Sequence, residues 1–135
     1  MKIKPVFYTM ISIFVVLVLF IFFSPDDLKR PLFPIAGIFA LVFFILGIVL
    51  IVLAARMKKS RLKIYLLLTG ISAAGIPACV ILHNLVYALF MVMFGEGFWG
   101  EAGDEPVFFI IGVLVFPILF IVGAVRSLIL FKKKK

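Results

Sequence analysis

The stretch LVFFILGIVLIVLAARMKKSRLKIYLLLTG, residues 41–70, decides the fold of this chain. A long apolar run is followed by a short basic segment, RMKKSRLK at 56–63, and then by a second apolar run. A helix needs about 20 apolar residues to cross a hydrocarbon core of about 30 Å, and charged residues stay in the water on either side. The stretch therefore predicts two membrane-spanning helices joined by a basic loop.

The rest of the chain repeats this pattern. The composition is 66% hydrophobic with a mean hydropathy of +1.36, which lies far outside the range of soluble domains. We expect an all-α, polytopic membrane protein in which residues 1–135 form one domain, a bundle of four transmembrane helices. The predicted spans are residues 6–23, 35–55, 64–94 and 107–131, with Pro25, Pro31, Pro34 and Pro106 at span edges.

Charge fixes the expected orientation. All of the 14 basic residues except Lys29 and Arg30 fall on one side of a four-span arrangement. By the positive-inside rule, both termini and the basic loop face the cytoplasm, in the inner or plasma membrane of the cell. The final Lys132–Lys135 run fits a cytoplasmic anchor attracted to anionic lipid, or else a dilysine retrieval signal. The acidic residues all fall on the other side: Asp26, Asp27, Glu96, Glu101, Asp104 and Glu105.

Several function classes are excluded by what the sequence lacks. One cysteine, Cys79, allows no intramolecular disulfide, CxxC centre or thiolate zinc site. No hydrolase, metalloprotease or phosphate-loop motif is present, so we expect no enzymatic activity, no cofactor and no metal centre. We also expect no nucleic-acid binding, because the basic residues flank apolar spans. A proton-coupled exporter is disfavoured because the first span has no acidic residue.

Small residues and prolines suggest how the helices pack. Small residues spaced four apart allow close approach of helices in lipid, and they occur as Ala36/Ala40, Gly70/Ala74, Ala74/Ala78 and Gly123/Ser127. We expect spans one and two to face lipid and spans three and four to form the tightly packed pair. Span three would be about 46 Å long, so it must kink, project or end early. Pro77 and Pro117 are the candidate kinks, and they fall at nearly the same depth in an antiparallel pair.

A polar stripe runs along span three. On a helical wheel, Thr69, Ser72, Cys79, His83 and Tyr87 lie within a sector of about 80°, with Asn84 on its flank. Such a stripe should face other helices or a cavity. If the end of span three projects from the bilayer, His83 lies near the outer boundary of the hydrocarbon, with Tyr87, Phe98 and Trp99 in the aromatic belt; if residues 88–94 stay submerged, His83 lies nearer to the middle of the membrane. We favour the first arrangement.

Two roles are open for His83. The first is a structural hydrogen bond to a neighbouring helix. The second is a cluster with Glu101 or Glu105 that binds a divalent cation or senses pH. Asp104 is expected to cap the start of span four.

The second half of the chain resembles a family of small four-span prokaryotic membrane proteins without an assigned function. The resemblance lies in GIP (75–77), LHNLVYAL (82–89), EPVFF (105–109) and the proline-then-glycine pattern of span four. It implies a shared motif at His83, Asn84 and Tyr87, and no activity. We expect a structural or accessory protein that packs with itself or with a partner membrane protein. The alternatives are an oligomeric channel or transporter that uses the His83 region and the two kinks, and a pore-forming lysis or immunity-type protein.

Overall fold

The computed structural model describes residues 2–133, apart from the side chain of Ala102. This part of the chain is helical without strands and has four helices long and apolar enough to span a membrane. The predicted fold class is therefore confirmed. Lys134 and Lys135 of the terminal lysine run lie outside the described residues. The first three helices are α1 (Ile3–Phe23), α2 (Asp26–Ala55) and α3 (Arg61–Phe94). The fourth helix is continuous and is made of α4 (Val107–Ile110), the π-helix η2 (Ile111–Val115) and α5 (Phe116–Lys133). A 3₁₀ turn, η1 (Gly100–Ala102), precedes the fourth helix.

The helices extend beyond the apolar spans, most clearly at the start of α2. This helix begins at Asp26, so Pro31 and Pro34 lie inside it and not at its edge as predicted. Pro25 has an extended conformation just before the helix, and acidic residues in the first turn suit the positive end of the helix dipole. The predicted span, residues 35–55, marks where hydrophobicity begins, and the helix itself begins nine residues earlier, at Asp26.

The turn between α2 and α3 is closed by polar contacts. The Ser60 hydroxyl accepts the Lys63 N–H (3.2 Å) and so caps α3. The Lys63 ammonium donates to the carbonyls of Ala55 (2.7 Å) and Met57 (3.0 Å). These carbonyls lack helical partners at the end of α2, and a cation also suits the negative end of its dipole. The two contacts hold the helices in a tight antiparallel hairpin.

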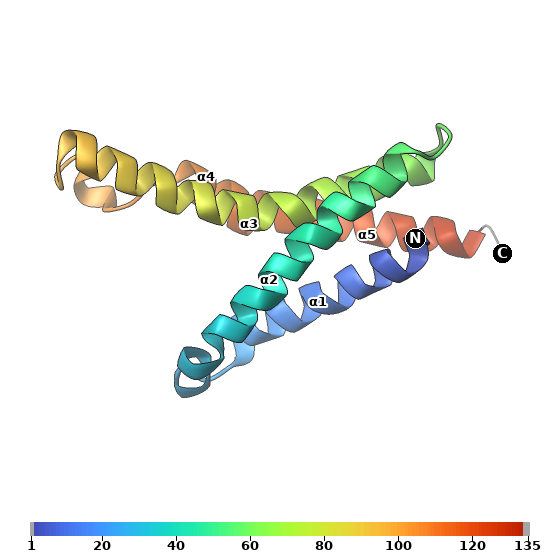
Figure 1. Cartoon of the computed structure of the whole chain (residues 1–135), viewed down its shortest axis with the longest axis horizontal. Helices are drawn as coiled ribbons and strands as arrows, with labels where there is room; N and C mark the ends of the chain where they lie inside the picture. Colours follow the sequence, from blue (N-terminus) through green and yellow to red (C-terminus); the bar gives the residue numbers. More distant parts are fainter. Residues whose placement is uncertain (1, 134–135) are drawn as a thin grey trace.

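The four helices form two hairpins that meet at one end and separate toward the other (Figure 1). The start of α1, the end of α5 and the α2–α3 turn share the closed end. The tips of the α1–α2 and α3–α4 hairpins lie apart at the open end. The basic segments are thus gathered at one end of the molecule, and the acidic residues are divided between the two separated tips.

Two glycines allow the backbones of α2 and α3 to approach closely. A Cβ atom placed on Gly47 would lie 2.8 Å from the Ala74 amide nitrogen, and one on Gly70 would lie 2.9 Å from the Ile51 side chain. The expectation that span two faces lipid is therefore wrong. Hydropathy does not distinguish a lipid-facing helix from one packed on another helix, because both surfaces are apolar.

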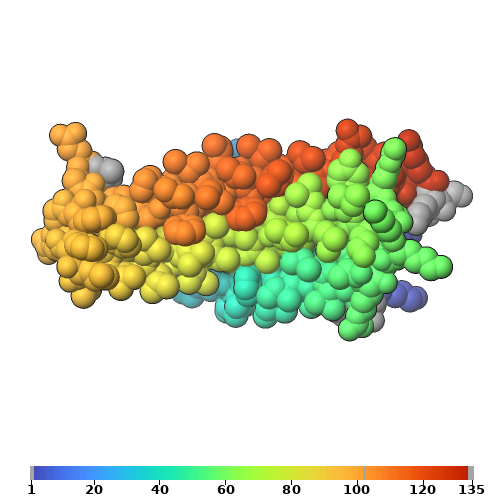
Figure 2. Space-filling model, turned by 90° about the horizontal axis from the view of Figure 1, so that it is seen from above, coloured from blue at the N-terminus to red at the C-terminus, as the bar shows by residue number. Residues whose placement is uncertain are grey.

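The fourth helix packs along α3 over its whole length, as Figures 1 and 2 agree. A Cβ on Gly75 would meet the Phe116 ring at 2.6 Å, a Cβ on Gly112 would meet the Cys79 Cβ at 2.7 Å, and a Cβ on Gly123 would meet the Thr69 hydroxyl at 2.6 Å. Spans three and four are thus closely packed, as predicted.

The irregularity associated with Pro117 lies just before it, in the π-helix Ile111–Val115. Pro117 has no N–H and its ring crowds the carbonyl one turn earlier, which a wider π turn accommodates. The Gly75–Phe116 contact places Pro117 at nearly the depth of Pro77, as the sequence predicted. The helix α3 continues through Pro77. It has 34 residues in all and is about 51 Å long. It therefore extends beyond a hydrocarbon core of about 30 Å.

An aromatic core fills the closed half of the bundle. The Phe14 and Phe120 rings lie 4.4 Å apart, the Phe43 and Phe120 rings 5.4 Å apart, and the Phe7 and Phe131 rings 5.4 Å apart. Phe7, Phe43 and Phe120 are buried, so α1 and α2 contribute to the core as α5 does. Stacked or tilted aromatic pairs add to the packing energy of these helices.

Candidate functional site: a histidine between two carboxylates

The start of the fourth span brings two carboxylates to the histidine of α3. The Nδ1 atom of His83 lies 3.2 Å from Oε2 of Glu105 and 2.9 Å from the Glu105 carbonyl oxygen. The Nε2 atom on the other side of the ring lies 3.4 Å from Oδ1 of Asp104. We name these three residues, His83, Asp104 and Glu105, the His83 cluster. It lies where the fourth helix begins beside α3, eleven residues before the end of α3 at Phe94.

The two carboxylates on either side of the imidazole differ in how exposed they are. The Glu105 residue is 3% exposed, and the side chain of His83 is 14% exposed. The Asp104 side chain is 56% exposed. Glu105 is thus the inner partner of the imidazole, and Asp104 is the partner on the solvent side.

Glu105 is held in place by the first turn of α4. Its Oε1 accepts hydrogen bonds from the N–H groups of Val107 (2.6 Å) and Phe108 (3.1 Å). Pro106 has no N–H, so these are the first donors of the helix that need a partner. The expectation that Asp104 caps this helix is wrong. Asp104 accepts the N–H of Glu105 (2.8 Å) instead, because the longer side chain of Glu105 is the one that reaches the helix N-terminus.

The surroundings of Glu105 favour its charged form. Burial by itself raises the pKa of this carboxyl, but the hydrogen bonds from the Phe108 N–H, from His83 and from the Val107 N–H outweigh it. The pKa of Glu105 therefore lies below its ordinary value. A carboxylate at this position also suits the positive end of the fourth helix.

The two sides of the imidazole face different acceptors at the same time. A neutral ring carries one N–H and donates on one side only. A protonated ring carries two and donates both to Glu105 and to Asp104, with a charge-assisted hydrogen bond on each side. The cluster therefore binds the loop to α3 most completely when the ring is charged.

Aromatic contacts also attach the loop between α3 and α4 to α3. The indole N–H of Trp99 donates to the Tyr87 carbonyl (3.5 Å), and the two rings are stacked with centroids 6.3 Å apart. Phe90 of α3 contacts the rings of Phe98 (4.9 Å) and Trp99 (5.6 Å). The residues before η1 are thus held by aromatic contacts, and the residues after it by the His83 cluster.

The predicted stripe is divided between two environments. Thr69, Ser72 and Cys79 are buried. Thr69 packs against Gly123 of the fourth helix and Cys79 against Gly112. The Thr69 hydroxyl donates a hydrogen bond to the Tyr65 carbonyl of its own helix (2.8 Å). Tyr87 is half-buried beneath Trp99. Asn84 is exposed and donates to the Val80 carbonyl (2.8 Å).

Other predicted site residues lie outside the cluster. Glu96 and Glu101 are exposed in the loop, and neither contacts His83. Within residues 2–133, no three His, Cys, Asp or Glu side chains are placed to hold a metal ion.

A pocket of about 240 Å³ lies beside the cluster, between His83 and Asn84 on α3 and Phe108, Phe109 and Val113 on the fourth helix.

Sequence reasoning missed two features of this region. One is the capping role of Glu105, for which the signal was its position directly before Pro106. The other is the pair of buried hydroxyls on Ser72 and Ser127, which have no hydrogen-bond partner among the described residues. They are packed between helices, where their small size explains their presence better than their polarity.

Comparison of the chain with protein-family models, with curated proteins and with solved structures gave no match. The resemblance based on residues 75–125 therefore stays a prediction.

Proposed function

We propose that this chain is a multi-pass protein of the inner or plasma membrane with both termini in the cytoplasm. Among residues 2–133, the basic residues other than Lys29 and Arg30 belong to the end that holds the start of α1, the α2–α3 turn and the end of α5, which supports this orientation. The orientation is testable with cysteine variants on a Cys79→Ala background. A membrane-impermeant thiol reagent should label Gly97→Cys in intact cells, and Lys58→Cys only after the membrane is opened.

Within that membrane, we propose a structural or accessory role exerted by helix packing with a second copy or with a partner membrane protein. The observation that carries this proposal is the divergence of the two hairpins. On α2, Ala36 and Ala40 share a face with the buried Phe43 and Gly47 but are only half-buried themselves. Nothing lies within 4 Å of a Cβ placed on the adjacent Gly37. The packing face of α2 thus continues beyond the part that α3 covers.

The matching face of α3 also continues uncovered. Gly70 and Ala74 contact α2, and about two to four turns beyond Ala74 on the same face Ile81, Asn84 and Ala88 are exposed. The Asn84 amide nitrogen is bonded within its own helix, while its oxygen has no partner among the described residues. An amide of this kind in an apolar span is suited to a hydrogen bond across a helix–helix interface. The opening between the two hairpins thus has the small residues of α2 on one side and the Asn84 amide of α3 on the other. These surfaces are suited to packing against an additional transmembrane helix.

Oxidative crosslinking in native membranes tests this role. On the Cys79→Ala background, Ala40→Cys and Asn84→Cys should crosslink to a second copy or to a partner. Leu41→Cys is the matched control, since Leu41 is exposed on the opposite side of α2. If neither interface variant crosslinks, or if Leu41→Cys crosslinks equally well, the packing role is wrong.

A second candidate is an oligomeric channel or transporter. The observations that favour it are the pocket beside His83 and the π-helix at the depth of Pro77 and Pro117. π-Helical turns occur frequently at functional sites. Reconstitution in liposomes tests it, because His83→Ala should then change proton, cation or small-solute flux. Equal flux through wild type, His83→Ala and empty liposomes would exclude this candidate.

A further inference from the structure

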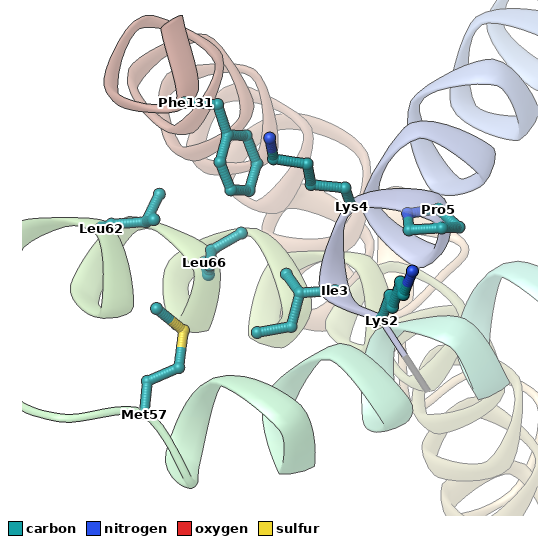
Figure 3. Close-up of a pocket in the computed structure, with 8 residues that line it drawn as sticks. All are labelled: Lys2, Ile3, Lys4, Pro5, Met57, Leu62, Leu66 and Phe131. Carbon is teal, nitrogen blue, oxygen red and sulfur yellow. The ribbon is translucent and has the colours of Figure 1, made fainter. Parts of the chain in front are cut away.

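A second pocket lies at the closed end, far from the His83 cluster. It measures about 320 Å³ and is formed where the start of α1, the α2–α3 turn, the start of α3 and the end of α5 come together (Figure 3). Leu62, Leu66 and Phe131 are buried at its base, and Ile3 and Met57 are half-buried at its sides. The wall is therefore apolar, although the pocket lies in the most basic part of the molecule.

Two lysines lie at this pocket. The ammonium of Lys4 lies 5.5 Å from the centre of the Phe131 ring, and Figure 3 shows its side chain extending toward that ring. Lys2 is exposed beside it. Across residues 2–133, neither lysine forms an ion pair with a carboxylate, since the ion pairs found there involve Lys29 and His83. The ammonium of Lys63, at the same end, already donates hydrogen bonds to the carbonyls of Ala55 and Met57 in the α2–α3 turn.

An apolar wall with cations beside it is complementary to an amphiphilic anion. In a membrane protein, the pocket is placed where the basic segments meet the bilayer surface, which is the level of the lipid headgroups. We propose that this pocket binds one anionic phospholipid. The phosphate lies near Lys2 and Lys4, and the first part of one acyl chain lies on Leu62, Leu66 and Phe131.

The size of the pocket limits how the lipid is held. Ligand pockets that enclose a whole small molecule measure about 300–1,000 Å³, and this one is at the lower end. Only the upper part of one chain therefore enters, and the remainder of the lipid stays in the bilayer. The inference requires that the protein is inserted in a membrane. It does not depend on the helix packing proposed above.

Native mass spectrometry of the full-length protein in detergent tests the proposal. The probes are phosphatidylglycerol and phosphatidylcholine with identical acyl chains, titrated separately. The double variant Lys2→Gln/Lys4→Gln removes the lysines at the pocket. Its matched control, Lys58→Gln/Lys59→Gln, removes the same charge from exposed positions at the same end that do not line the pocket. Ile3→Trp fills the pocket without changing charge, and circular dichroism checks that each variant is folded.

We expect one phosphatidylglycerol to bind at lower concentration than phosphatidylcholine. The double variant at the pocket should weaken this binding about fivefold for each lysine, and the control should change it by less than about twofold. Ile3→Trp should weaken it as well, and inorganic phosphate should not displace it. The proposal is overturned if the two lipids bind equally, or if the control variant weakens binding as much as the pocket variant. Displacement by inorganic phosphate, or full binding by folded Ile3→Trp, would overturn the acyl-chain contact and leave a site for phosphate alone.

Discussion

Gly47 of α2 and Gly70 of α3 approach each other reciprocally: a Cβ placed on either glycine would lie 3.0 Å from the carbonyl oxygen of the other. The two backbones therefore touch without a side chain between them. In lipid, where burial of apolar surface gives no advantage, such contact is a principal source of helix association. The pair joins the two hairpins at the point from which they diverge.

Enlarging this contact should separate the hairpins. Gly47→Val is expected to lower the free energy of unfolding by about 1–3 kcal/mol, since neither backbone is able to move aside without disturbing its own helix. Gly37→Val is the matched control on the same helix, because nothing lies within 4 Å of its Cβ position. The measurement is unfolding in mixed micelles followed by circular dichroism. An equal loss in both variants would show that the effect comes from valine in a helix and not from the contact.

Removing the Glu105 side chain should loosen the start of the fourth helix. In Glu105→Ala the N–H groups of Val107 and Phe108 lose their acceptor, and His83 keeps the carbonyl of residue 105 but loses the carboxylate. We expect hydrogen exchange at these two amides to become about five- to tenfold faster. Glu101→Ala, in the same loop and exposed, should leave their exchange unchanged. Unchanged exchange in Glu105→Ala would mean that Glu105 does not cap the helix.

Acid should destabilise the protein through Glu105. Its pKa in the folded protein lies below the ordinary value of 4.5, so the unfolded chain binds more protons as the pH falls. The stabilisation is thus fully present above pH 4.5 and is lost as the pH falls through the lower pKa of the folded state. Unfolding experiments between neutral pH and about pH 3 should show a steeper loss in wild type than in Glu105→Gln, which has no charge to lose. Parallel curves would contradict the prediction.

His83 should restrain the acidic loop. In His83→Ala, the contacts of the imidazole with the carboxylate and carbonyl of Glu105 and with the carboxylate of Asp104 are lost, and the loop is expected to open more often. A glutamate-specific protease added from the loop side should then cleave after Glu101 about tenfold faster, since cleavage follows the population of the open form. Asn84→Ala is the control, because Asn84 bonds only within its own helix. Equal rates in the two variants would show that His83 does not hold the loop.

The polar stripe shows how far sequence periodicity reaches. Helical spacing placed Thr69, Cys79 and His83 on one face, and that face does lie against the fourth helix. Spacing left both Glu101 and Glu105 open as partners of His83, and it did not predict the contact with Asp104. That choice depends on the path of residues 95–106, which is set by the aromatic contacts and by the Glu105 cap.

By itself, the sequence determined the number of spanning helices and the separation of basic from acidic segments. Both are properties of single segments, because hydropathy and charge act on each span independently of its neighbours. Only the tertiary structure decided that Gly47 meets Gly70, that the hairpins diverge, and that His83 lies between Asp104 and Glu105. These features depend on the shape fit between apolar surfaces and on hydrogen-bond geometry, which the hydrophobicity of a span does not encode.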